Sequence, residues 1–173
     1  TVKTLDDIPF LPIEFFKSKK VICGSFTPKI TFTSSGTTGS EVSKHHVKNL
    51  ELYENSYLTA FRHFYGDIED YCVLALLPSY LEREGSSLIY MANDLIHKSK
   101  HPDSGFYLDD LDRLQKTLLE LDAQNTKTLL LGVSFALLDM AEKFPLKLKN
   151  TVVMETGGMK GRKKELIREE LHQ

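Results

Sequence analysis

The chain has 173 residues, of which 41% are hydrophobic and 27% charged, and its formal net charge is −2. This length suits one globular domain that can bury a core. The mixed charges form no basic stripe of the kind that binds nucleic acid, and the apolar runs are far too short to cross a bilayer. Neither nucleic acid nor a membrane is therefore expected as a partner, and two cysteines without metal-type spacing, Cys23 and Cys72, predict a reduced, cytoplasmic protein.

The first half of the chain predicts a lead-in followed by alternating elements. Residues 1–29 carry three prolines and are expected to form a short helix and extended chain. Ile30–Ser34 is rich in β-branched residues and predicts a strand. After a loop of Gly, Thr and Ser, Asn49–Phe64 has the apolar spacing of a helix. Tyr71–Leu77 predicts a second strand, and Ser86–His97 a helix that Ser86 caps.

The second half continues the alternation. Helices are predicted at Asp109–Asp122, Phe135–Lys143 and Arg162–His172, and strands at Thr128–Leu131 and Thr151–Glu155. Strands that alternate with helices favour parallel pairing, so residues 30–173 are expected to form an open, mostly parallel α/β sheet with helices on both faces. Ligands of such sheets bind beyond the carboxyl ends of the strands.

The most informative segment follows the first predicted strand and reads TSSGTTGSEVSK from Thr33 to Lys44. Gly36 and Gly39 free the backbone to converge amide N–H groups on an anion, the hydroxyls add donors, and Lys44 adds a positive charge. Composition alone leaves a flexible, solvated linker equally open. A position after a strand and before a helix favours a polyphosphate site. The spacing Gly-x4-Gly-Lys of a Walker loop is absent.

This loop resembles the phosphate-binding signature of the adenylate-forming superfamily, which includes acyl-CoA synthetases, luciferases and nonribosomal adenylation domains. The resemblance implies that the loop holds the β- and γ-phosphates of ATP while a carboxylate attacks the α-phosphate. The implied cofactor-binding residues are Ser35, Gly36, Thr37, Thr38 and Gly39. Lys44 is the implied catalytic residue, although it lies five residues after the last glycine where the family usually places it three after.

A second match ends the last predicted strand. The family lays a strand that ends in Gly-Gly against the adenine ring, and Thr156-Gly157-Gly158 stands at that place here. A flat ring packs closely only where no Cβ intervenes, which is the physical reason for the glycines. An ordinary strand-to-helix turn is the alternative.

Two further sequence segments resemble parts of the family that contact the carboxylic acid substrate. Residues 77–87, together with residues 155–162, are similar to the acyl-protein synthetase branch, which activates fatty acids in the bacterial luminescence fatty-acid reductase complex. This similarity implies that Tyr80 and Arg83 face the acyl-adenylate, and a solvated charged turn is the alternative. The junction at Gly132 resembles one that lines the acyl pocket. Its alternative is a helix capped by Ser134.

The resemblance implies an ATP-dependent acid–thiol ligase that activates a carboxylic acid, expected to be fatty, as an acyl-adenylate and passes the acyl group to a thiol. It covers the first half of the family pattern, part of the large N-terminal domain. The motif whose glutamate binds Mg²⁺ does not occur in the chain, so the metal ligand is expected downstream and the chain to be an incomplete, inactive fragment. An acyl-accepting or reductase protein is the implied partner.

Two other functions are alternatives to the ligase. One is a non-catalytic nucleotide-binding or scaffolding module, which would keep the loop rich in Ser, Thr and Gly and lack the catalytic residues. A phosphotransferase is disfavoured because no catalytic-loop aspartate motif is visible. No metal site is predicted in the chain, since His45 and His46 have no partner at metal-ligand spacing.

Overall fold

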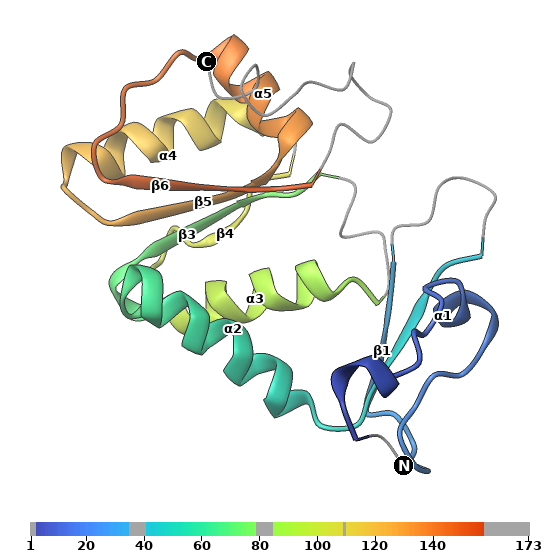
Figure 1. Cartoon of the computed structure of the whole chain (residues 1–173). Helices are drawn as coiled ribbons and strands as arrows, with labels where there is room; N and C mark the ends of the chain where they lie inside the picture. Colours follow the sequence, from blue (N-terminus) through green and yellow to red (C-terminus); the bar gives the residue numbers. More distant parts are fainter. Residues whose placement is uncertain (1–2, 35–40, 79–84, 109, 158–173) are drawn as a thin grey trace.

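A computed structural model describes residues 3–34, 41–78, 85–108 and 110–157 (Figure 1). The α-helices are α1 (Phe15–Ser18), α2 (Leu50–Tyr65), α3 (Ser87–Ser99), α4 (Leu111–Ala123) and α5 (Ser134–Lys143). The strands are β1 (Ile30–Thr33), β2 (Lys44–Val47), β3 (Cys72–Leu76), β4 (Gly105–Phe106), β5 (Thr128–Val133) and β6 (Thr151–Thr156). Two short 3-10 helices, η1 (Leu5–Asp7) and η2 (Ile68–Asp70), complete the described elements.

The main sheet has four parallel strands in the order β4-β3-β5-β6. Figure 1 shows α2 and α3 on one face and α4 and α5 on the other. The predicted open, mostly parallel α/β sheet with helices on both faces is therefore confirmed. The two central strands, β3 and β5, are buried along their whole length because helices cover both of their faces.

Three helices begin at a capping side chain, and the predicted cap by Ser86 is one of them. Asn49 accepts a hydrogen bond from the Glu51 amide at the start of α2, and Ser86 accepts one from the Ile89 amide at the start of α3. Asp110 does the same for α4 with the Arg113 amide. Short polar side chains satisfy amide groups that have no partner within the helix, which fixes these boundaries. None of the described helices is long and apolar enough to cross a membrane.

The first predicted strand lies outside the parallel sheet, which corrects the sequence prediction. β1 pairs antiparallel with β2, with Thr33 opposite Lys44 and Ile30 opposite Val47. The loop rich in Ser, Thr and Gly therefore joins two strands of a hairpin and is not followed directly by a helix. Pairing between β1 and β2 satisfies the backbone of a segment, residues 44–47, for which the sequence predicted no strand.

Aromatic rings attach this hairpin to the helices below the sheet. Phe32, which is buried, meets Tyr53 of α2 at a ring-centroid distance of 5.3 Å and Tyr90 of α3 at 5.8 Å. The Thr33 amide also donates to the Gly85 carbonyl over 2.8 Å, just before α3 begins. The end of β1 is thus fixed beside the amino end of the helix that follows β3.

Candidate functional site

β3 and β5 are parallel neighbours in the sheet, and the chain continues from them toward opposite edges, from β3 to β4 and from β5 to β6. Leu76 at the end of β3 lies in register with Gly132 of β5. The helix that follows β3 lies on one face of the sheet, and the helix that follows β5 lies on the other (Figure 1). Open α/β sheets bind ligands at this kind of switch point, outside the carboxyl ends of the strands. The segments that follow β3 and β5 therefore begin at a switch point of the sheet.

A serine and a glutamate connect β5 and β6 at the same edge. β5 runs directly into α5, and the Ser134 side chain, 2% exposed, donates a hydrogen bond to the Glu155 carboxylate. Glu155 stands in register with Gly132, so the bond spans the two strands. The alternative of a helix capped by Ser134 is wrong, because Val133 is the N-cap of α5 and no side-chain cap is formed.

Gly132 has a packing role in the described structure. A Cβ at this position would lie 2.7 Å from Cγ and Cδ2 of Leu137 on α5. The glycine allows the first turn of α5 to sit closely on the end of β5. Its contact with an acyl chain stays a prediction.

Thr156 and Gly157 lie at the end of β6, beside this junction. Thr156 is the last residue of the strand and stands in register with Val133. Gly157 has a φ of +46° and is exposed, and a Cβ built on it meets no atom of the described structure within 4 Å. A left-handed backbone that is open to approach is what a flat ring needs for close packing. The adenine contact that the resemblance implies for Thr156 and Gly157 stays a prediction.

Lys44 lies on the hairpin and not on the parallel sheet. It is exposed, and its backbone pairs with Thr33. Two hydrogen bonds close the base of the connecting loop, one from the Ser34 amide to the Ser43 carbonyl and one from the Ser43 amide to the Ser34 hydroxyl, each 3.0 Å long. Lys44 is therefore held at the foot of the loop by main-chain pairing.

Several predicted site residues lie outside the described residues. They are Ser35, Gly36, Thr37, Thr38 and Gly39 of the hairpin loop, Tyr80 and Arg83 after β3, and Gly158 after β6. The predicted helix at residues 162–172 also falls there.

The two adjacent histidines lie on β2, where neighbouring side chains point to opposite faces. A 3.0 Å hydrogen bond joins Nδ1 of His46 to the Thr31 hydroxyl, whereas the ring of His45 stacks on Phe16. Within the described residues, no group of three or more His, Cys, Asp or Glu side chains is placed to hold a metal ion.

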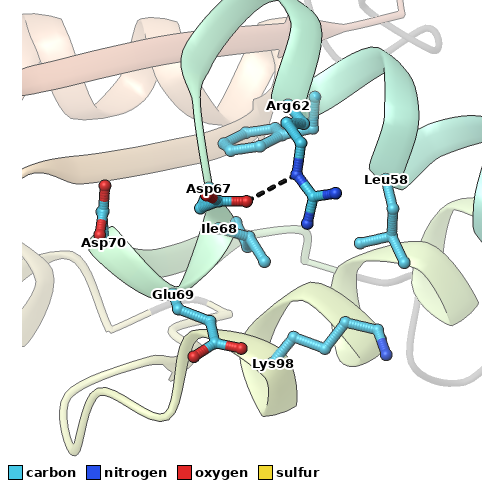
Figure 2. Close-up of a pocket in the computed structure, with 8 residues that line it drawn as sticks. Leu58, Arg62, Asp67, Ile68, Glu69, Asp70 and Lys98 are labelled. Atoms are coloured by element: carbon cyan, nitrogen blue, oxygen red, sulfur yellow. Dashed lines mark hydrogen bonds and ion pairs between the residues drawn. The ribbon is translucent and has the colours of Figure 1, made fainter.

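A pocket of about 570 Å³ lies away from this edge, where the end of α2, η2 and the end of α3 meet. Figure 2 shows Arg62 extending into it beside Asp67, with Glu69 and Lys98 at its rim. Arg62 and Asp67 form an ion pair of 2.6 Å, and both side chains are largely exposed. Because η2 precedes β3, the pocket stands at the amino end of that strand, opposite the edge where ligands of such sheets bind.

Sequence reasoning did not identify the Ser134–Glu155 pair. The two residues are 21 positions apart, and only the parallel register of β5 and β6 brings them together.

Comparison with known proteins finds no match to a family model, to a curated protein or to a solved structure.

Proposed function

We propose that this chain is the nucleotide-binding part of an enzyme that uses ATP to activate a carboxylic acid as an acyl-adenylate and then transfers the acyl group to a thiol. The observation that carries the proposal is the switch point between β3 and β5, with the open left-handed Gly157 beside it. The family resemblance supplies the reaction and the fatty nature of the acid.

The two loops would bind different parts of ATP. The backbone at Thr156 and Gly157 would pack against adenine, and the hydroxyls of the hairpin loop, with Lys44, would hold the β- and γ-phosphates. An oxygen of the acid attacks the α-phosphorus, and the bond to the bridging oxygen of pyrophosphate breaks. Positive charge and N–H or O–H donors stabilise the negative charge that grows on the phosphate oxygens.

Mg²⁺ would balance phosphate charge in such a transfer. No group of three or more His, Cys, Asp or Glu side chains in the described part of the chain is placed to hold a metal ion. The resemblance implies that a glutamate downstream of the chain would bind it.

The test is carboxylate-dependent exchange of pyrophosphate into ATP, measured on the longer protein that the resemblance predicts. Thr37→Val and Lys44→Ala each remove one donor to the transition state, so turnover should fall roughly 100- to 1,000-fold. Lys116→Ala is the matched control, because Lys116 is an exposed lysine on α4 that forms only a helical ion pair with Glu120. Its exchange rate should stay normal.

Thermal melts of all three variants exclude misfolding as the cause. Normal exchange in Thr37→Val and Lys44→Ala would refute the phosphate-loop assignment. If the protein binds ATP but no carboxylic acid supports exchange of pyrophosphate into ATP, the alternative of a non-catalytic nucleotide-binding module would be favoured.

A further inference from the structure

The lead-in before the hairpin exposes several apolar side chains close together. Five large ones within residues 8–15 face solvent in the described structure: Ile8, Phe10, Leu11, Ile13 and Phe15. Phe10 is fully exposed, and Ile13 is 71% exposed. Apolar surface gathered in this way marks a site of interaction with a protein or a membrane, whereas single exposed apolar residues need no explanation.

The fold holds this segment in place. The ring of Phe16 stacks on His45 of β2 at a ring-centroid distance of 6.3 Å, while its neighbour Phe15 remains exposed. Backbone hydrogen bonds from the Phe15 amide to the Pro12 carbonyl and from the Lys19 amide to the Phe15 carbonyl shape the chain around α1. Figure 1 shows α1 beside the hairpin, away from the main sheet. The exposed side chains are thus presented by a folded part of the chain.

Basic residues follow the apolar ones directly. Lys17, Lys19 and Lys20 are all exposed, and Glu14 is the one carboxylate within residues 8–20. Three lysines and one glutamate give this stretch a formal charge of +2, in a chain whose net charge is −2. Lysine is depleted in interfaces between proteins, whereas lysines beside exposed Phe and Leu side chains are typical of segments that bind an anionic bilayer surface. The charge of the segment therefore favours a lipid surface over a protein groove.

We propose that residues 8–20 bind the surface of an anionic membrane, with Phe10, Leu11 and Ile13 inserted among the lipids and the three lysines at the headgroups. This inference does not rest on the proposed function. It replaces the expectation that a membrane is not a partner, which followed from apolar runs too short to cross a bilayer. A segment that lies in the interface does not need that length, because a few apolar side chains and basic neighbours suffice for binding.

Binding to lipid vesicles tests the proposal. The protein should bind vesicles of phosphatidylcholine mixed with phosphatidylserine, bind pure phosphatidylcholine much more weakly, and lose affinity as salt is added. Phe10→Ala should weaken binding about 10-fold or more, because a large apolar side chain no longer leaves water. Replacing the three lysines together with Ala should weaken binding roughly 100-fold, at about 5-fold for each lysine.

Matched variants separate this effect from a change in the fold. Leu52→Ala removes an apolar side chain that is 74% exposed on α2, and Lys116→Ala removes an exposed lysine on α4. Both should bind the mixed vesicles like wild type. Because Phe10 is fully exposed, Phe10→Ala should keep the wild-type melting temperature. No binding to the mixed vesicles at low salt, or equal binding by Phe10→Ala and wild type, would overturn the proposal.

A fluorescent probe distinguishes a membrane from another occupant. The chain contains no Trp, so Phe10→Trp adds a single reporter. Its emission should shift to shorter wavelength when the mixed vesicles are added, whereas the emission of Leu52→Trp should stay constant. A shift of the Phe10→Trp emission that grows with protein concentration in the absence of lipid would instead assign the segment to an interface between copies of the chain, and the membrane proposal would be wrong.

Discussion

Individual residues at the end of β5 show how closely packing and a candidate site can overlap. Gly132 was predicted as a substrate contact, and the structure gives it a second reason to be glycine, since Leu137 occupies the space of its missing side chain. Ser134 was weighed as a helix cap and instead bonds to Glu155. Residue type alone does not distinguish these roles, because each depends on what the register of the sheet brings nearby.

The packing role of Gly132 predicts a loss of stability. In Gly132→Ala the new methyl group meets Cγ of Leu137 at 2.7 Å, so α5 or the side chain must shift. Overpacking of this kind typically lowers the free energy of unfolding by about 1–3 kcal/mol. Urea denaturation measures the change, and Leu137→Ala in the same chain should recover part of it relative to the sum of the two single variants. Unchanged stability in Gly132→Ala would contradict the packing role.

At the scale of elements, the long helices and the central strands were predictable from the sequence. Their apolar spacing and capping residues are local signals, and α2, α3 and α4 begin within two residues of the predicted starts. Strand β2 was missed because Lys44-His45-His46-Val47 has little apolar alternation of its own. Its conformation depends on pairing with β1, and β4, with two residues, depends likewise on β3. Such non-local pairing leaves only a weak signal in the sequence.

Hydrogen bonds from tyrosines join α2 to α3. Tyr57 donates to Asp94 over 2.6 Å, Tyr90 donates to Glu54 over 2.5 Å, and Tyr53 donates to the Ser87 carbonyl over 3.0 Å. The hydrogen bond to Glu54, followed by burial, raises the pKa of Tyr90 to about 12. Burial, followed by the hydrogen bond to Asp94, raises the pKa of Tyr57 as well.

These shifts predict a loss of stability at alkaline pH. The tyrosines are protonated in both folded and unfolded protein below pH 10.0, the ordinary pKa, so their full contribution is present there. Between pH 10.0 and about 12 the unfolded chain loses the Tyr90 proton first, so the free energy of unfolding falls as the pH rises. Tyr90→Phe should lower stability by about 1 kcal/mol at pH 8 and make the fall above pH 10 less steep. Urea midpoints from pH 8 to 11 measure both effects, and parallel curves for the two proteins would contradict this account.

At the scale of the whole molecule, the parts predicted to bind one nucleotide belong to two different sheets. Lys44 belongs to the antiparallel hairpin, whereas Thr156 ends β6 of the parallel sheet and Gly157 follows it directly. The alternation of strands and helices predicted the parallel sheet, but it also placed β1 in that sheet, because a single β-branched strand carries no mark of its partner. The contact between Thr33 and Gly85 connects the hairpin to the segment that follows β3. In Figure 1 the loop end of the hairpin and the carboxyl ends of the main sheet lie toward the same side of the molecule.

The placement of the two loops on different sheets predicts that their contributions to binding can be measured separately, with ligands that carry only the base or only the phosphates. Tripolyphosphate has the phosphates without the base, adenosine has the base without the phosphates, and ATP has both. Lys44→Ala should weaken binding of ATP and tripolyphosphate about 10-fold or more and leave adenosine unchanged, because a charged hydrogen bond to phosphate is lost. Gly157→Val should weaken ATP and adenosine and leave tripolyphosphate unchanged, because its side chain would enter the open space beside the backbone.

Matched variants keep this comparison free of general effects on folding. Gly24→Val places the same side chain on another left-handed glycine, with a φ of +73° and equally open surroundings, in the lead-in segment. It bears the same kind of backbone strain as Gly157→Val, roughly 1–2 kcal/mol, but should not change the binding of any of the three ligands. Lys116→Ala controls for the loss of a surface charge.

Isothermal titration with the three ligands gives the affinities. If Lys44→Ala and Gly157→Val weakened adenosine and tripolyphosphate equally, the hairpin and the parallel sheet would not bind separate parts of one nucleotide, and the assignment of base and phosphates to the two loops would be wrong.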